Sequence, residues 1–151
     1  MGRPQAVVNL LTVLRSWPRQ SSLEEHLAVE LDRFRREAPP VDLADEMLAM
    51  RMIRLADTEP ALRTAWLMAC DQAERAMCLI IADRLDRPAD DLEVRMHAEA
   101  AAAVVRVLDE HIGATVLTGA DLAELTGATA VARRYAHAIR TATGGVVGDP
   151  V

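Results

Sequence analysis

The sequence contains no lysine: its 17 basic residues are all arginines, and 23 acidic residues give a formal net charge of -6. Nucleic-acid affinity rests mainly on clustered basic side chains that neutralise phosphates. The densest cluster, Arg33, Arg35 and Arg36, has acidic residues on both sides, Glu30 and Asp32 before it and Glu37 after it. We therefore expect a solvated helix face there, and we expect the chain alone not to bind DNA.

The sequence also lacks a long apolar run, a secretion signal and a closely spaced cysteine pair. No stretch approaches the roughly 18 apolar residues of a membrane span, and the first residues do not follow the pattern of a signal peptide. We expect a soluble, cytoplasmic protein. Its two cysteines, Cys70 and Cys78, lie eight residues apart on one predicted helix, about 12 Å at ~1.5 Å per residue. That distance predicts reduced thiols rather than a disulfide.

Apolar residues recur at helical spacing between proline and glycine breaks, and no alternating strand pattern interrupts them. Ser22 and Glu25 have the spacing of a capping box, Asp90 and Glu93 repeat it, and Asp42 can cap the helix between them. The pattern predicts an all-α fold, an antiparallel bundle of about six helices in one domain, with a flexible tail after it. The domain covers 1–143, its helices 4–17, 22–37, 42–56, 60–86, 90–115 and 121–143, and the tail 144–151.

The helix predicted over 90–115 is apolar on more of its circumference than one core requires. One face carries Leu92, Met96, Ala100, Ala103 and Val107, and a second carries Ala101, Val105, Leu108 and Ile112. A surface helix needs only a ~100° apolar stripe to dock on its own core. The width indicates two apolar partners, while Arg95, Glu99, Arg106 and Asp109 are assigned to the solvated side.

The last predicted helix has a stripe of mostly small side chains, which let helices approach closely. A second copy of the chain is the natural partner for both helices. The alternative is that both helices are central in a monomer.

Methionines are concentrated in the middle helices, where phenyl-type rings are scarce. Flexible thioethers can fill irregular space or adapt to apolar ligands. The residues alone favour an ordinary methionine-rich core over a pocket. His97 lies between the two apolar faces of its helix, and it is either a hydrogen-bonded core residue or a polar anchor for a ligand.

Catalytic and metal-binding patterns are missing. No histidine has a carboxylate three residues before it, as a di-iron bundle needs, and the cysteine spacing does not suit zinc. There is no glycine-rich phosphate loop between a strand and a helix and no nucleophile elbow. We expect no enzyme activity, no cofactor and no metal; an enzyme of bundle type remains an alternative that would need polar groups converging in a cavity.

The segment from Leu55 to Ile112 resembles the C-terminal domain of actinobacterial TetR-family transcriptional regulators. The likeness rests on a "TEPALR" turn at Thr58–Arg63, a "DRLDRPADD" turn at Asp83–Asp91 and the Ala-rich helix that follows. The stretch from Val7 to Leu27 is similar to the connecting helix and next helix of that family. The helix-turn-helix that such regulators place before this region has no counterpart ahead of Val7.

The resemblance implies an effector-sensing, homodimerising domain of a regulator, a repressor, whose ligand controls operator binding through the missing helix-turn-helix. It raises the pocket interpretation above the plain core, but it does not identify lining residues. Position and chemistry suggest Met47, Met50, Trp66, Cys70, Met77, Met96 and His97 for a small hydrophobic effector.

By the same resemblance the final two helices would pair with those of a second subunit. The predicted interface comprises Ala101, Val105, Leu108, Ile112, Leu122, Leu125, Thr129, Ala132, Ala136 and Ile139. The alternative function is a standalone helical module that forms heterodimers with a full-length regulator. A truncated sequence or a start site placed too far downstream would equally explain the missing DNA-reading part.

Overall fold

The computed structural model describes residues 5–37, 39–117 and 127–151, and the described chain folds into helices without strands. The prediction of an all-α bundle is confirmed. The helices are α1 (Gln5–Arg15), α2 (Leu23–Glu37), α3 (Pro40–Leu55), α4 (Pro60–Leu85), α5 (Leu92–Leu117) and α7 (Ala128–Ala142). None of the described helices is both long and apolar enough to cross a membrane.

Local signals account for where the helices begin. At α2, the backbone N–H of Glu25 donates to Ser22 Oγ over 3.2 Å, and the N–H of Ser22 donates to the Glu25 carboxylate over 3.1 Å. This reciprocal capping box is the one that the sequence predicts. At α5 the cap is Asp91 rather than Asp90, because Asp91 Oδ1 accepts the N–H of residues 93 and 94. The third helix begins at Pro40, a favourable first-turn residue, and not at a cap formed by Asp42.

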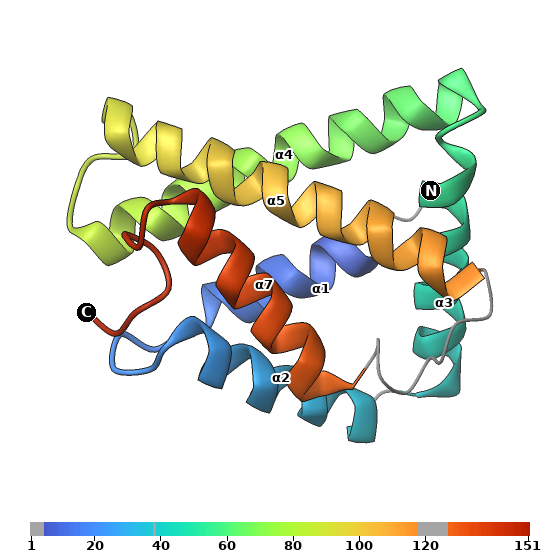
Figure 1. Cartoon of the computed structure of the whole chain (residues 1–151), viewed down its shortest axis with the longest axis horizontal. Coiled ribbons are helices and arrows are strands. Elements are labelled where there is room, and N and C mark those ends of the chain that lie inside the picture. Colours follow the sequence, from blue (N-terminus) through green and yellow to red (C-terminus); the bar gives the residue numbers. More distant parts are fainter. Residues whose placement is uncertain (1–4, 38, 118–126) are drawn as a thin grey trace.

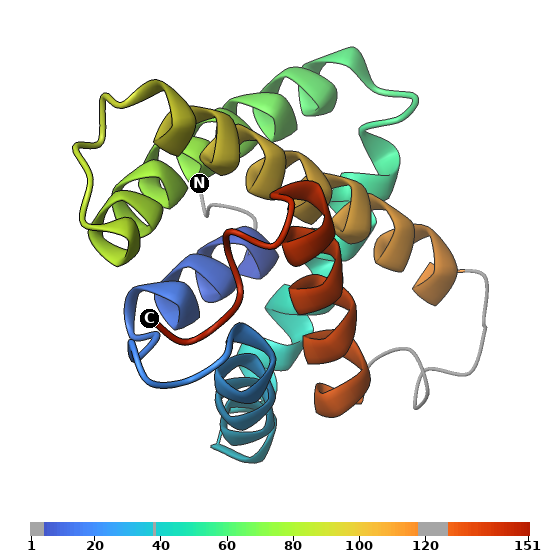
Figure 2. The ribbon, with the colours of Figure 1, turned by 60° about the vertical axis from the view of Figure 1, so that its left-hand side comes forward.

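The two longest helices, α4 and α5, run antiparallel and side by side (Figure 1). Helix α7 crosses α5 and packs along α2, while α1 lies between the α4–α5 pair and α2 in both views (Figures 1 and 2). Helix α3 lies across the end of the bundle where α4 begins and α5 ends (Figure 1). The main core is thus enclosed on several sides by helices, and its most deeply buried large side chains are Leu23, Leu27, Ile81, Val94 and Ile139.

Helices α3 and α5 approach each other at Gly113. A Cβ atom at this position would lie 3.3 Å from the backbone oxygen of Met50, closer than most real Cβ contacts. The absence of a side chain therefore lets the backbone of α3 pack directly on α5. This contact fixes α3 close to a second, smaller core cluster formed by Ile53, Ala56 and Trp66.

The segment 144–151 packs on the bundle, so the prediction of a flexible tail is wrong. The Leu23 N–H donates to the Gly148 carbonyl, and the Val151 N–H donates to the Arg19 carbonyl, each over 2.8 Å. Val147 is buried in the main core. The segment thereby supplies a hydrogen-bond acceptor to the start of α2 and covers the adjacent core.

The C-terminal end of α1 is fixed by several contacts. The guanidinium of Arg84, from α4, lies 3.3 Å from the centre of the Trp17 ring and donates to the Pro18 carbonyl over 3.2 Å. The second amino group of Arg84 donates to the Asp149 carbonyl over 2.9 Å. His26 Nε2, from α2, donates to the Val13 carbonyl over 2.7 Å. These contacts hold the end of α1 against α2, α4 and the C-terminal segment.

Candidate functional site

A small cavity of about 20 Å³ lies where α1, α4 and α5 meet. Each helix presents one face to it, since the lining residues of α4 and of α5 recur at spacings of three and four. Alanines on both helices leave room that larger side chains would fill. The space suffices for about one water molecule. Its lining consists of Leu10, Leu11, Cys70, Ala73, Met77, Ala102, Val105, Arg106 and Asp109.

Asp109 is a buried acid at this apolar cavity, with a side chain that is hydrogen-bonded on one oxygen alone. Tyr135, from α7, donates its hydroxyl to Asp109 Oδ1. The other oxygen, Oδ2, is buried and has no hydrogen-bond partner among the described residues. Burial raises the pKa of Asp109 to about 7, and the neighbouring Glu110 adds to the rise, while the Tyr135 hydrogen bond opposes it. The carboxyl group therefore titrates near neutral pH.

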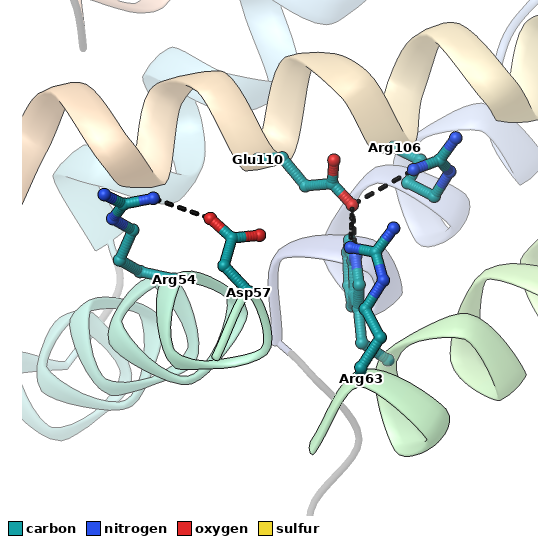
Figure 3. A network of polar contacts seen from close by, with 6 residues as sticks. Arg54, Asp57, Arg63, Arg106 and Glu110 are labelled. Carbon is teal, nitrogen blue, oxygen red and sulfur yellow. Dashed lines mark hydrogen bonds and ion pairs between the residues drawn. The ribbon is translucent and has the colours of Figure 1, made fainter. Parts of the chain in front are cut away.

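Glu110, the next residue of α5, has the opposite environment. Its Oε1 accepts hydrogen bonds from Arg63 over 3.0 Å, Trp66 Nε1 over 2.9 Å and Arg106 over 3.1 Å. Figure 3 shows the arginines converging on this carboxylate from α4 and α5, with the Arg54–Asp57 ion pair nearby. Burial opposes ionisation, but these hydrogen bonds and charges outweigh it and hold the pKa of Glu110 below its usual value. Glu110 is thus an ionised link between α4 and α5.

Cys70 is the one thiol that lines the cavity. Burial raises its pKa to about 11, and the negative charge of Asp109 contributes to the rise. A thiol with this pKa remains protonated at neutral pH and is a poor nucleophile. In the cavity, Cys70 is therefore a small, weakly polar wall residue. Neither Cys70 nor Cys78 forms a disulfide, as the sequence predicts.

The family match agrees with this architecture. Residues 31–133, which are 103 of the 151 residues, match the family described as the MftR C-terminal domain, a TetR-type family. The chain belongs to the MftR C-terminal domain family. The resemblance to TetR-type C-terminal domains is confirmed. The chain matches no curated protein and no solved structure significantly.

The MftR C-terminal domain fold brings only some of the predicted ligand residues together. Cys70 and Met77 line the cavity. Trp66 is buried in the smaller core cluster, against which Cys70 also packs. Met47 and Met50 are half-buried against the main core and do not line this cavity.

Two other candidates lie elsewhere. Met96 is 61% exposed on the outer face of α5 and does not line this cavity, so the cavity gives its prediction as a ligand residue no support. His97 is half-buried on α5 and does not line the cavity either. Sequence reasoning missed Asp109, which it assigned to the solvated side, although an acid one turn after Val105 lies beside the apolar face. It also missed the α1 residues Leu10 and Leu11, because their role depends on how α1 packs.

The predicted dimer-interface residues lie mainly inside a single chain. Leu108 is half-buried and packs on the main core, whereas Thr129 is exposed. Leu122 and Leu125 lie outside the described residues. A side chain that is already buried by its own chain cannot also contact a partner, so this assignment needs correction. The predicted interface residues that the chain itself buries are Ala101, Val105, Ile112, Ala132, Ala136 and Ile139.

The other apolar face of α5 is the exposed one. Leu92 is 70% exposed and Val107 is 54% exposed. With the exposed Met96 and Ala103, they recur along about four turns of the helix on the side opposite the core. We call these four residues the outer stripe. The sequence therefore identifies two apolar sides of α5, and the side that it assigns to a partner is the one that the chain itself buries.

Proposed function

We propose that this chain is the effector-sensing and homodimerisation domain of a TetR-type transcriptional repressor. Its effector is a small, hydrophobic molecule that controls operator binding by a helix-turn-helix outside these residues. The observation that carries the proposal is the apolar cavity between α1, α4 and α5 in a member of the MftR C-terminal domain family.

The size of the cavity implies a mechanism for sensing. At about 20 Å³ it cannot hold an organic molecule without widening. Leu10 and Leu11, in the middle of α1, form one wall, whereas the C-terminal end of α1 is held by the contact of Arg84 with Trp17 just after it. Entry of a ligand would therefore move the N-terminal half of α1 more than its C-terminal end. A helix that precedes the domain would be displaced with it. Ligand binding would therefore shift the population from the arrangement with a closed cavity to the one with a widened cavity and a displaced α1.

A thermal-denaturation screen tests the sensing role. Small apolar probes such as benzyl alcohol and indole should stabilise the chain, by about 2.7 kcal/mol for a probe at a hundredfold excess over its Kd. Ala102→Leu should abolish the effect because the added side chain fills the cavity. Ala65→Leu, on the exposed surface of α4, is the matched control. Equal stabilisation of the wild type and Ala102→Leu would contradict binding in this cavity.

The outer stripe of α5 is the proposed surface for the second copy. Large apolar side chains that repeat along one exposed helix face are typical of interfaces rather than of a free surface. By comparison, the exposed face of α7 carries Arg133, His137 and Arg140, which favour solvent. The dimer would thus pair α5 of one subunit with α5 of the other through a self-complementary contact.

Analytical ultracentrifugation of charge-substituted variants tests this interface. The double variant Met96→Glu, Val107→Glu should sediment as a monomer, since it places four carboxylates at a paired interface. Leu79→Glu alters a side chain of α4 that is 65% exposed but lies off the stripe, and it should sediment like the wild type. A wild-type chain that remains monomeric at high concentration would refute homodimerisation.

A further inference from the structure

We propose that the effector carries a protonated amino group on a small apolar body, and that Asp109 binds this group inside the cavity. The inference rests on the proposed sensing function and adds the chemical class of the ligand. Two features of the described residues support it: an oxygen of Asp109 that has no hydrogen-bond partner among them, and the absence, among the same residues, of a positive charge free to pair with it.

The unpartnered oxygen points to a missing hydrogen-bond donor. Tyr135 occupies Oδ1, and Oδ2 is buried without a partner among the described residues. Leaving such an atom without a hydrogen-bond donor is unfavourable, and more so when the group is charged. A water molecule in the cavity would find little to bind besides Oδ2, since the walls are mostly apolar and a buried water needs 2–4 polar partners. A donor carried on an apolar molecule fits the site better.

The charges around Asp109 favour a cation among the possible donors. Arg106 also lines the cavity, but its guanidinium donates to Glu110, and Arg63 of α4 donates to the same carboxylate. Glu110 itself adds negative charge, and burial keeps the Cys70 thiol of α4 neutral. Helix α7 contributes the hydroxyl of Tyr135, and α1 contributes apolar side chains. Within the described residues, no cation therefore neutralises Asp109.

The apolar walls define the rest of the ligand. Leu10 and Leu11 lie on α1, and Met77 and Val105 lie on α4 and α5. A flexible methionine can adopt other rotamers as the cavity widens. A ligand carboxylate would be repelled by Asp109 and Glu110, and a neutral alcohol could satisfy Oδ2 but would leave its charge unpaired. An aliphatic or aromatic amine meets both requirements.

Titration with benzylamine and benzyl alcohol separates the charge from the apolar body, because the two probes differ mainly in the amino group. NMR-monitored titrations near pH 7.5 should give a Kd for benzylamine at least about tenfold lower than for benzyl alcohol, equivalent to about 1.4 kcal/mol. In Asp109→Asn the preference should vanish while benzyl alcohol still binds. Glu99→Gln, which removes an exposed acid from the same helix, should keep the preference.

Two further measurements keep the test decisive. Tyr135→Phe leaves the Asp109 carboxylate in place but removes a hydrogen bond that favours its ionised form, so this variant should retain the preference for benzylamine with its onset at a higher pH. The affinity of the wild type for benzylamine should also rise as the pH increases through about 7, because Asp109 ionises there. The affinity for benzyl alcohol should not follow the same profile.

The outcomes distinguish the ligand class from the sensing function. If both probes bind equally, or if Asp109→Asn keeps the preference for benzylamine, the amine proposal is overturned and the sensing function stands. If neither probe binds at millimolar concentration, both proposals are overturned.

Discussion

The buried carboxyl of Asp109 should make the stability of the domain depend on pH. With a pKa of about 7, this group keeps its proton in the native state over a pH range in which the unfolded chain has lost it. The native state then binds more protons, so stability falls as pH rises from about 4 to about 7. The pKa of Asp109 lies about three above that of an ordinary aspartate, which corresponds to about 4 kcal/mol of free energy of unfolding in total. About 2–3 kcal/mol of this is lost between pH 5 and pH 8.

Asp109→Asn isolates this contribution, since asparagine has a similar shape, can still accept from Tyr135 and does not titrate. Urea unfolding at about pH 5 and about pH 8, at one protein concentration, gives the free energies of unfolding. The variant should gain about 2–3 kcal/mol relative to the wild type between the two conditions. Glu99→Gln should show no such gain. A difference between Asp109→Asn and wild type that stays constant with pH would refute the buried, protonated state of Asp109.

Three further predictions follow from the packing, two for substitutions and one for a chemical reaction. Gly113→Val should destabilise the domain by about 1–3 kcal/mol by forcing a backbone carbonyl of α3 away from α5, as urea unfolding would show. Arg84→Ala should cost about 2–3 kcal/mol and speed hydrogen exchange in the C-terminal segment, since it removes the contact with Trp17, whereas the exposed Arg75→Ala should have little effect. Cys70 should react with iodoacetamide at about pH 8 more than tenfold more slowly than a free thiol, and fast alkylation in the folded chain would contradict its raised pKa.

The helices could be predicted because their signals are local. The Ser22–Glu25 box needs only residues three apart, and the breaks between helices follow from proline and glycine. The C-terminal segment could not be predicted in this way. Its glycines favour a flexible chain, but its order depends on the Leu23 N–H, the Arg84 side chain and the core around Val147, all supplied by distant helices.

The cavity could be predicted only in part for the same reason. Cys70 and Met77 could be predicted from the sequence because they share an apolar helix face with Trp66. Asp109 could not be predicted, since its burial depends on α7 and on the hydroxyl of Tyr135, which lies 26 residues further along the chain. A charged residue at the edge of an apolar stripe is usually solvated, so periodicity alone assigns it to the surface.

The two sides of α5 are both apolar, but only one of them is buried by the chain itself. The buried side carries Ala98 and Ala101, whose small side chains let α5 lie close to its neighbours. The outer stripe instead carries Leu92, Met96 and Val107, and each of these side chains would gain about 1.5–3 kcal/mol by becoming fully buried. Apolarity alone cannot separate the sides, because both carry alanine together with larger apolar side chains: Val105 and Ile112 are buried, and Ala103 lies in the outer stripe. One helix therefore borders the proposed ligand site on one side and the proposed dimer contact on the other, so that a shift of α5 on ligand binding would reach the interface directly.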